Sequence, residues 1–349
     1  MWYVALDLHS ETTSISVRSS RGIVVSRDIV PTTRPALRHA LQKVRGRARL
    51  VCEAGPLSRW IRDTLETRLR EVMVCDRRRS RLAASKGDRI DADKLSELLW
   101  KNELQPVYVP RGEHVILRRL AMHYIRMMRE RIRVIIRLRA LFLESGIRVS
   151  SPRAQPERVP IHRLRDRGSK YVAKAYVAQL ERASELLAAA KDEMLAYARF
   201  FAAFHLLQSV PHVGEIRSAQ LIAIVVDPGR FRSRRRFWSY GGVGIVQKIS
   251  SEHYIDDGVV VRDERVRSAH LSKACQPVLK KILRDIALHA SLRSGVFRRC
   301  YEAFIARGMR PALARVALAR KIATIILAVW RSGVPFDGSR VFINGSNSG

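Results

Sequence analysis

The chain has 349 residues, 47% of them hydrophobic, so it is long enough for two or three domains with buried cores, which argues against disorder. Lysine and arginine number 65 against 32 acidic residues, a net charge of +33 with a pI near 11.3. This charge is spread along the chain and predicts a polyanionic partner. The longest apolar run, 322–330, is too short to cross a membrane, which excludes a spanning role.

Four cysteines, Cys52, Cys75, Cys275 and Cys300, lie far apart without a CxxC spacing. That spacing argues against a zinc site or a disulfide framework and fits a reducing cytosol. The sequence begins directly with a strand-like segment, so we expect no secretion signal and a cytoplasmic protein.

Residues 1–105 are predicted to form an α/β domain. Short apolar or alternating runs predict strands, and amphipathic runs predict helices: strands at 2–6, 12–17, 22–30, 49–53 and 71–75, and helices at 34–44, 58–69 and after Gly87. Three strands followed by helix, strand, helix, strand and helix is the order of a ribonuclease-H-like fold. In that order the first and fourth strands are neighbours, which would bring Asp7 close to Glu53.

Four carboxylates stand where a solvated surface charge would not. Asp7 and Glu53 each end an apolar strand, and Asp88 and Asp91 are spaced i,i+3 at the predicted start of a helix. Isolated buried carboxylates are costly, so a bound cation would account for them. Two Mg²⁺ ions about 3.5–4 Å apart could be held by such a set for phosphodiester chemistry. The alternative is that Asp7 caps a turn and Glu53 pairs with an arginine.

Four arginines, Arg77, Arg78, Arg79 and Arg81, follow the last predicted strand. They could contact phosphates, although for any one of them a solvated basic face is the simpler interpretation.

Residues 106–206 are predicted to form a helical arm. A first heptad seam runs from Leu117 to Phe142 with Arg131 as its one charged position, and a second runs from Tyr176 to Phe204. The Pro-rich stretch 150–160 between them predicts that the chain goes out and returns. The seams could be a private core or could associate between chains, and both interpretations stay open.

Residues 207–343 are predicted to form a second chemical unit, followed by a tail at 344–349. Residues 207–223 resemble a helix-hairpin-helix with Gly214 in the turn, which would present N–H groups to a phosphate. Five arginines follow among the aromatics Phe231, Phe237 and Trp238, a mixture suited to backbone contact and base stacking: Arg230, Arg232, Arg234, Arg235 and Arg236. Ser250 and Ser251 are predicted to lie in a loop and could supply a nucleophile. Helices are expected at 268–290, 296–306 and 312–331.

These segments together resemble the DEDD-type insertion-sequence transposases, the bridge-RNA-guided recombinases. The resemblance rests on five motifs that span nearly the whole chain: Ala-Leu-Asp7-Leu-His, Cys-Glu53-Ala-Gly, Lys-Gly-Asp88-Arg-Ile-Asp91-Ala, Ser-Val-Pro-His-Val-Gly-Glu and Phe-Trp-Ser-Tyr-Gly-Gly. It implies a RuvC-like domain whose acidic set is Asp7, Glu53, Asp88 and Asp91, then a coiled coil, then a mainly helical transposase domain with a serine nucleophile. Counting from Tyr240, the nucleophile is Ser250, with Ser251 as the alternative. The family usually has a Pro after the Tyr motif, then a Ser-Gly and later a Gly-Asn. This chain has other residues at those three places.

The resemblance also implies partners and chemistry. It implies a DNA recombinase of a bacterial or archaeal mobile element, nucleoid-associated, with a structured guide (bridge) RNA that pairs with donor and target DNA. Ser250 would attack a DNA phosphate beside Mg²⁺ held by the acidic set, and the chain would act as a homo-oligomer, a dimer or a tetramer. The sequence has no Walker pattern, so no ATP site is expected. The alternatives are a metal-dependent RuvC-like junction nuclease without a covalent intermediate and a nucleic-acid packaging protein that needs only the charge.

Overall fold

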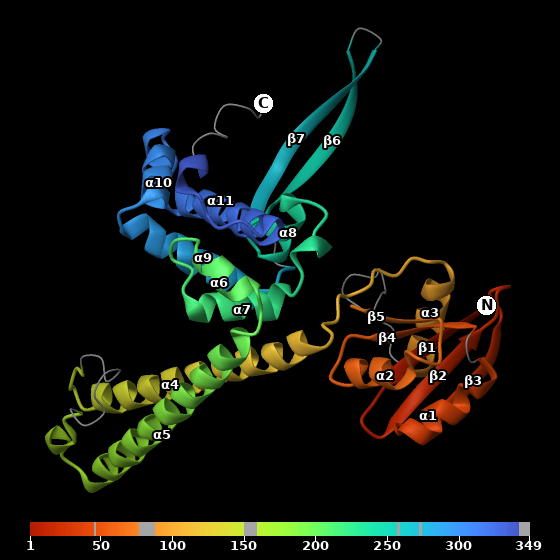
Figure 1. Cartoon of the computed structure of the whole chain (residues 1–349), viewed down its shortest axis with the longest axis horizontal. Coiled ribbons are helices and arrows are strands. Elements are labelled where there is room, and N and C mark those ends of the chain that lie inside the picture. Colours follow the sequence, from red (N-terminus) through yellow and green to blue (C-terminus); the bar gives the residue numbers. More distant parts are fainter. Residues whose placement is uncertain (45–46, 77–87, 150–158, 257–258, 272–273, 342–349) are drawn as a thin grey trace. The chain divides into compact units, whose positions relative to one another are not determined.

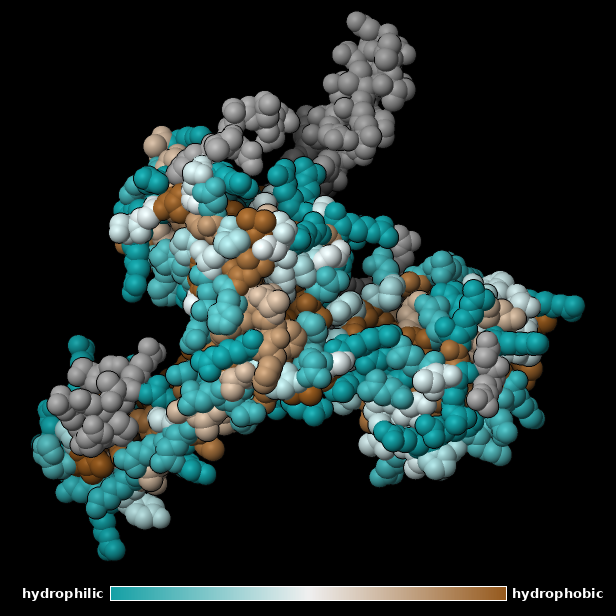
Figure 2. Space-filling view, in the orientation of Figure 1, coloured by the Kyte–Doolittle hydropathy of each residue, from teal (hydrophilic) through white to brown (hydrophobic). Residues whose placement is uncertain are grey.

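The computed structural model describes residues 1–44, 47–76, 88–149, 159–256, 259–271 and 274–341. For residues 88–91, 247–256 and 259–269 it describes the backbone alone. The chain divides into two compact units, residues 1–110 and 111–349 (Figure 1). In both units, hydrophilic side chains cover most of the surface that Figure 2 shows, with smaller hydrophobic areas between them.

The first unit is built on a five-stranded mixed sheet. Its strands are β1 (Trp2–Leu8), β2 (Thr12–Arg18), β3 (Val24–Pro31), β4 (Ala48–Glu53) and β5 (Glu71–Cys75), in the order β3-β2-β1-β4-β5. The first three strands pair antiparallel, whereas β1 with β4 and β4 with β5 pair parallel. The predicted meander, the parallel alternation and the adjacency of the first and fourth strands are therefore confirmed.

Helices cover both faces of this sheet (Figure 1). On one face, Leu6 and Leu50 share a core with Leu37 of α1 (Arg34–Ala40) and Ile61 of α2 (Ser58–Leu65). On the other face, alternate strand residues pack against α3 (Asp88–Trp100) through Leu95. The alternation of strand side chains between faces produces these two cores. α1 and α2 end earlier than the sequence predicted, and a 3₁₀ turn at Gln42–Val44 continues the first.

The second unit begins with a helical hairpin. α4 (Glu113–Glu144) and α5 (Arg167–Ala198) lie side by side along the arm, with a 3₁₀ turn, Ile161–Arg163, between them in the chain (Figure 1). The distal half of the arm, made of the end of α4 and the start of α5, has its own core around Phe142 and Leu180. The predicted out-and-back hairpin is confirmed. Arg131, the charged position of the predicted seam, donates from Nε to Ser184 Oγ of α5 at 2.9 Å, so its polar group is satisfied inside the pair.

The rest of the second unit packs on the proximal half of the arm. Its elements are α6 (Ala203–Gln208), α7 (Glu215–Val225), α8 (Arg234–Tyr240), β6 (Ile245–Asp256), β7 (Val259–Leu271), α9 (Pro277–Leu292), α10 (Val296–Ala306) and α11 (Pro311–Ser332), with 3₁₀ turns at Pro228–Arg230 and Gly338–Val341. Residues of α7, α9 and α11 form the centre of one large core with Leu117 and Met194 of the arm. Among the described residues, no helix is long and apolar enough to cross a bilayer.

Two predictions for this region are wrong. Residues 245–256 and 259–271 pair as a long antiparallel ribbon, so Ser250 and Ser251 lie on a strand rather than in a loop. For the same reason the helix expected to start at Ser268 begins only at Pro277. Cross-strand pairing of the valine-rich β7 with β6 outweighs the polar, loop-like local composition. The helices predicted at 296–306 and 312–331 are confirmed.

Candidate functional site

Asp7 and Glu53 lie at the same edge of the sheet in the first unit. Leu6 of β1 pairs with Cys52 of β4 in parallel register, so the next residue on each strand, Asp7 and Glu53, is its neighbour across the two strands. Both residues belong to the face that α3 covers, since Ala5 and Val51, two positions earlier, lie in that core. The backbone thus brings together two of the four predicted carboxylates.

The surroundings of Asp7 are polar and only partly open. The Asp7 side chain is 20% exposed, and its Oδ2 lies 3.3 Å from Nε2 of His9. Across the antiparallel pair, Asp7 faces the buried Ser14 of β2. Glu53 is likewise half-buried.

A cysteine thiol lies beside these carboxylates. Cys75 of β5 pairs with Glu53, and burial raises the pKa of its thiol to about 12, with the charges of Glu53 and Asp76 adding to the rise. Burial likewise raises the pKa of Cys52 to about 12. Both thiols are therefore protonated at neutral pH. The charged oxygen donors beside them are carboxylates, and the imidazole of His9 lies next to Asp7.

Asp76 was missed in the sequence. It follows β5 directly, just as Asp7 and Glu53 stand at the ends of their strands, and it is half-buried. Asp76 could have been predicted as a third carboxylate of this edge, because it directly follows the apolar run of residues 72–75. Its charge contributes to the raised pKa of Cys75, so it lies close to the same edge.

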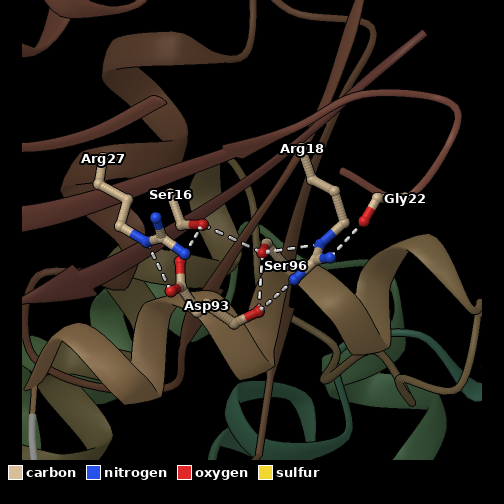
Figure 3. A network of polar contacts seen from close by, with 6 residues as sticks. All are labelled: Ser16, Arg18, Gly22, Arg27, Asp93 and Ser96. Atoms are coloured by element: carbon tan, nitrogen blue, oxygen red, sulfur yellow. Dashed lines mark hydrogen bonds and ion pairs between the residues drawn. The ribbon is translucent and has the colours of Figure 1, made fainter. Parts of the chain in front are cut away.

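A polar network, also missed in the sequence, holds α3 against β2 (Figure 3). Asp93 accepts hydrogen bonds from Ser16 Oγ and from Arg27 Nε, both at 2.7 Å. Arg18 donates to the Asp93 carbonyl at 3.2 Å and to Ser96 Oγ at 3.3 Å. Ser16 is fully buried and Asp93 partly so, and hydrogen bonds to charged groups in such places are strong.

This network also sets the direction of α3. At the far end of the helix, Trp100 donates from Nε1 to Ser20 O at 3.1 Å, beyond the end of β2, whereas Asp93 meets Ser16 within β2. The helix therefore runs antiparallel to β1, and going back from Asp93 leads toward Ser14, the partner of Asp7. From Asp93 back to Asp88, five residues of helix cover about 7.5 Å. From Ser16 back to Ser14, two residues of strand cover about 7 Å. The two lengths match, so the start of α3 approaches the edge at which Asp7 lies.

Asp88 and Asp91 occupy that start of α3. The backbone confirms the helix beginning after Gly87, and both positions continue the stripe of Ala92 and Leu95 that packs on the sheet. Their side chains lie outside those described, and Arg77, Arg78, Arg79 and Arg81 lie outside the described residues. Among the described side chains, no group of three or more His, Cys, Asp or Glu is placed to hold a metal ion, and that set excludes Asp88 and Asp91.

Ser250 lies on the ribbon of the second unit. In the register of β6 and β7 it pairs with Arg265, Ser251 pairs with Glu264, and a bulge falls between Lys248 and Ile249. The ribbon thus places an arginine position directly across from Ser250.

The Tyr240-Gly-Gly-Val-Gly motif directs the chain into this ribbon. A Cβ on Gly241 would lie 2.7 Å from Leu283 Cδ1 of α9, and Gly242 has φ +64° with Cys275 Sγ 2.7 Å from where its Cβ would stand. Arg320 of α11 donates from Nε to the carbonyl of Val243 at 2.9 Å. Only glycine permits this close approach and left-handed backbone, so the motif positions β6 on the helical core.

The arginine-rich segment 230–236 divides into two groups. Arg232, Arg234, Arg235 and Arg236 are exposed at the start of α8 and are available to a polyanion. Arg230 is half-buried, and its guanidinium lies over the rings of Phe231 and Tyr240 at 4.6 and 4.5 Å from their centroids. Arg230 therefore packs on these two rings, and its contact with a phosphate stays a prediction.

The base-stacking prediction is wrong for two of the three aromatics. Phe231 is 6% exposed and Phe237 is fully buried, and both belong to the core of the unit. Trp238 is half-buried and donates from Nε1 to Thr324 Oγ1 at 3.1 Å. Packing of α8 and of the turn before it into the core of the unit, rather than a nucleic-acid surface, explains these residues.

Two short helices joined by a turn at Gly214 occupy the segment predicted as a helix-hairpin-helix, and the motif itself stays a prediction. α6 ends at Gln208, α7 begins at Glu215, and Gly214 stands at the N-cap with no side chain capping the first turn. The first N–H groups of α7 therefore have no helical partner and keep the positive end of the helix dipole open.

Comparison with known protein families gives a match to part of the second unit. Residues 204–302 match the model of the transposase IS116/IS110/IS902 family, a span that runs from α6 into α10 and includes Ser250 and the ribbon. No curated protein matches the chain. The family match supports an insertion-sequence transposase, a DNA-processing enzyme.

Proposed function

We propose that the protein is the DNA transposase of a mobile insertion sequence, cutting and exchanging strands through Ser250 and an acidic site on a RuvC-like unit. The observation that carries this proposal is that Asp7 and Glu53 directly follow the paired residues Leu6 and Cys52 at one sheet edge, approached by the start of α3, in a chain whose residues 204–302 match a transposase family. A protein that only packages nucleic acid would need the positive charge alone, so the packaging alternative does not explain this acidic edge.

The acidic edge fits Mg²⁺. Carboxylate oxygens are the hard ligands this ion prefers, and the thiols nearby are held protonated. Asp7, Glu53, Asp88 and Asp91 would hold it, as two ions in the simplest arrangement. Bound there, Mg²⁺ would supply charge stabilisation to the attacking and leaving oxygens of a phosphodiester.

Ser250 is the proposed nucleophile, with Ser251 as the alternative. Its Oγ forms a bond to the phosphorus of a DNA phosphodiester, one P–O ester bond breaks, and the released sugar oxygen takes up a proton. A later attack by a sugar hydroxyl of the second strand reverses these bond changes and frees the serine. The number of ester bonds is conserved, so strand exchange needs no ATP. Arg265, paired with Ser250, would bind the phosphate.

Removing the Asp93 carboxylate should weaken Mg²⁺ binding at the acidic edge, although Asp93 is not one of the proposed metal ligands. Asp93→Ala removes the acceptor for Ser16 and Arg27, so we expect α3 to loosen and the Mg²⁺ concentration for half-maximal cleavage to rise about 10-fold or more, comparable to the loss of other groups that orient metal ligands. Hydrogen exchange of the α3 amides should speed up in parallel.

Asp28→Ala is the matched control, since Asp28 lies exposed on the same unit and accepts from Ser26 of its own strand. Unchanged Mg²⁺ dependence and unchanged exchange in Asp93→Ala would show that the network does not position α3.

Guidance by a structured RNA is the proposed source of site choice. A charge of +33 and the exposed arginines of α8 provide contacts to phosphates, which carry no sequence information. We expect protein freed of RNA to bind donor and target DNA with little preference, and recombination to return when RNA from the element's flank is added. An unrelated RNA of equal length is the control. Recombination at a defined site after complete removal of RNA would contradict guidance.

A homo-oligomer is the proposed working form. Ile132, Ile136 and Leu143 of α4 are 37%, 59% and 64% exposed along one side of the arm, which a second copy could cover. Light scattering should give the mass of a dimer or a tetramer, and Ile136→Glu should shift it toward the monomer. A wild-type protein that stays monomeric with RNA and DNA bound would exclude this form.

A further inference from the structure

A cavity of about 660 Å³ lies within the second unit. Its walls come from α4, α5, α7 and α9, and apolar side chains such as Ile125, Ile216 and Val278 supply much of its surface. The volume falls within the roughly 300–1,000 Å³ of sites that hold small ligands. The cavity is large enough for one ligand group and too small for a duplex.

Two polar side chains in this cavity lack a partner. Tyr124 and Gln220 both line it, each is 9% exposed, and neither has a hydrogen-bond partner among the described residues. Burial raises the pKa of the Tyr124 hydroxyl, so it stays a neutral donor and acceptor at neutral pH. The polar atoms of both side chains are open to solvent rather than fully buried, so a hydroxyl and an amide without a partner in the described part of the protein can meet a ligand with hydrogen-bonding edges in this cavity.

The mouth of the cavity favours an anion. Gly214 and Glu215 at the uncapped start of α7 line it, so the first N–H groups of that helix can donate to an anion in the cavity. Four cations line it as well, Arg129, Lys191, Arg217 and Lys281, against the two acids Glu215 and Asp285. Asp285 is paired with Lys281 at 2.7 Å and Glu215 with Arg199 at 3.6 Å. Arg129 has no partner among the described residues.

We propose that this cavity receives one unpaired nucleotide of a nucleic-acid strand. The base would lie between the apolar walls with its edge on the Tyr124 hydroxyl and the Gln220 amide, a side chain that can both donate to and accept from a base. The phosphate would lie at the start of α7 near Arg129. A second protein copy would cover the apolar wall and leave the amide unsatisfied. The inference rests on the proposed action on nucleic acid and concerns a bulged or flipped nucleotide.

Two hairpins that differ by one nucleotide test the pocket. One carries a single 2-aminopurine bulge and the other is fully paired, and each is made as RNA and as DNA to learn which strand supplies the nucleotide. Binding is measured without Mg²⁺, so that cleavage plays no part. We expect the bulged hairpin to bind about 10-fold tighter, comparable to one good contact to a base edge, with a change in 2-aminopurine fluorescence.

Four variants separate the pocket from general charge. Gln220→Leu keeps the volume of the side chain and should remove most of the preference for the bulge, and Arg129→Ala should reduce it. Arg126→Ala, one turn earlier on α4, exposed and outside the cavity, should weaken both hairpins equally. Thermal melting confirms that each variant is folded, and in Tyr124→Phe, which keeps the ring, the preference should fall as well.

The outcomes are distinct. Equal and tight binding of both hairpins, or a preference that survives both Gln220→Leu and Tyr124→Phe, would reject the pocket and leave the transposase proposal standing. Failure to bind either hairpin, as RNA or as DNA, would contradict the proposed function itself.

Discussion

Ser250→Ala protein is expected to bind DNA normally and to leave no DNA attached to protein. Without Oγ no bond to phosphorus can form, and deletion of the nucleophile of a covalent enzyme costs on the order of 10⁶ in rate. The reaction, stopped with denaturant after incubation with Mg²⁺, guide RNA and end-labelled DNA, should show a protein-linked band on a denaturing gel for the wild type alone. Mass spectrometry of the digested adduct should place the phosphate on residue 250.

Ser251→Ala is the matched control, since it removes the same atom from the next residue of β6. We expect it to reduce the adduct far less, because neighbouring strand residues point to opposite faces of a ribbon. If Ser251→Ala abolishes the adduct and Ser250→Ala spares it, the nucleophile is Ser251. If wild-type protein cleaves DNA and never leaves a protein-linked end, the junction-nuclease alternative is correct and the serine proposal fails.

Asp7→Asn is expected to remove strand cleavage in Mg²⁺ while nucleic-acid binding remains. The substitution keeps the shape of the side chain and deletes one charged ligand, and several kcal/mol of charge stabilisation correspond to a rate loss on the order of 10³-fold or more. Glu53→Gln, Asp88→Asn and Asp91→Asn should behave alike. Initial cleavage rates over a Mg²⁺ titration, beside filter-binding constants measured without Mg²⁺, separate the two effects.

Asp63→Asn provides the comparison for this series. Asp63 belongs to α2 on the opposite face of the sheet, where it is exposed and pairs with Arg59 and Arg62, so its loss should leave cleavage within about twofold of wild type. Wild-type cleavage by Asp7→Asn or Asp88→Asn protein would rule out the metal site at this edge. Loss of binding together with cleavage would assign the carboxylate to folding instead.

The acidic edge could be predicted from the sequence because its signals are local. A carboxylate directly after an apolar run marks the end of a buried strand, and the order of strands and helices then makes β1 and β4 neighbours. Asp7 and Glu53 follow from those two steps. The helix start at Asp88 follows from the glycine before it.

The ribbon could not be predicted in this way. Residues 245–256 carry polar and charged side chains that are typical of loops, and their strand conformation depends on pairing with residues 259–271. Composition likewise made Phe231 and Phe237 candidates for base stacking, although the fold buries both. Local sequence reports propensity, whereas burial depends on which elements pack together.

By itself, the sequence determined the sheet of the first unit, the hairpin of α4 and α5 and the two carboxylates at one edge, because periodicity and strand order are carried by neighbouring residues. Only the tertiary structure decided how α3 is held, since Asp93 meets Ser16 across 77 positions of the chain. It alone brought Tyr124 and Gln220 to one cavity from helices far apart in sequence. Contacts of this kind depend on packing among several elements, and no local pattern encodes them.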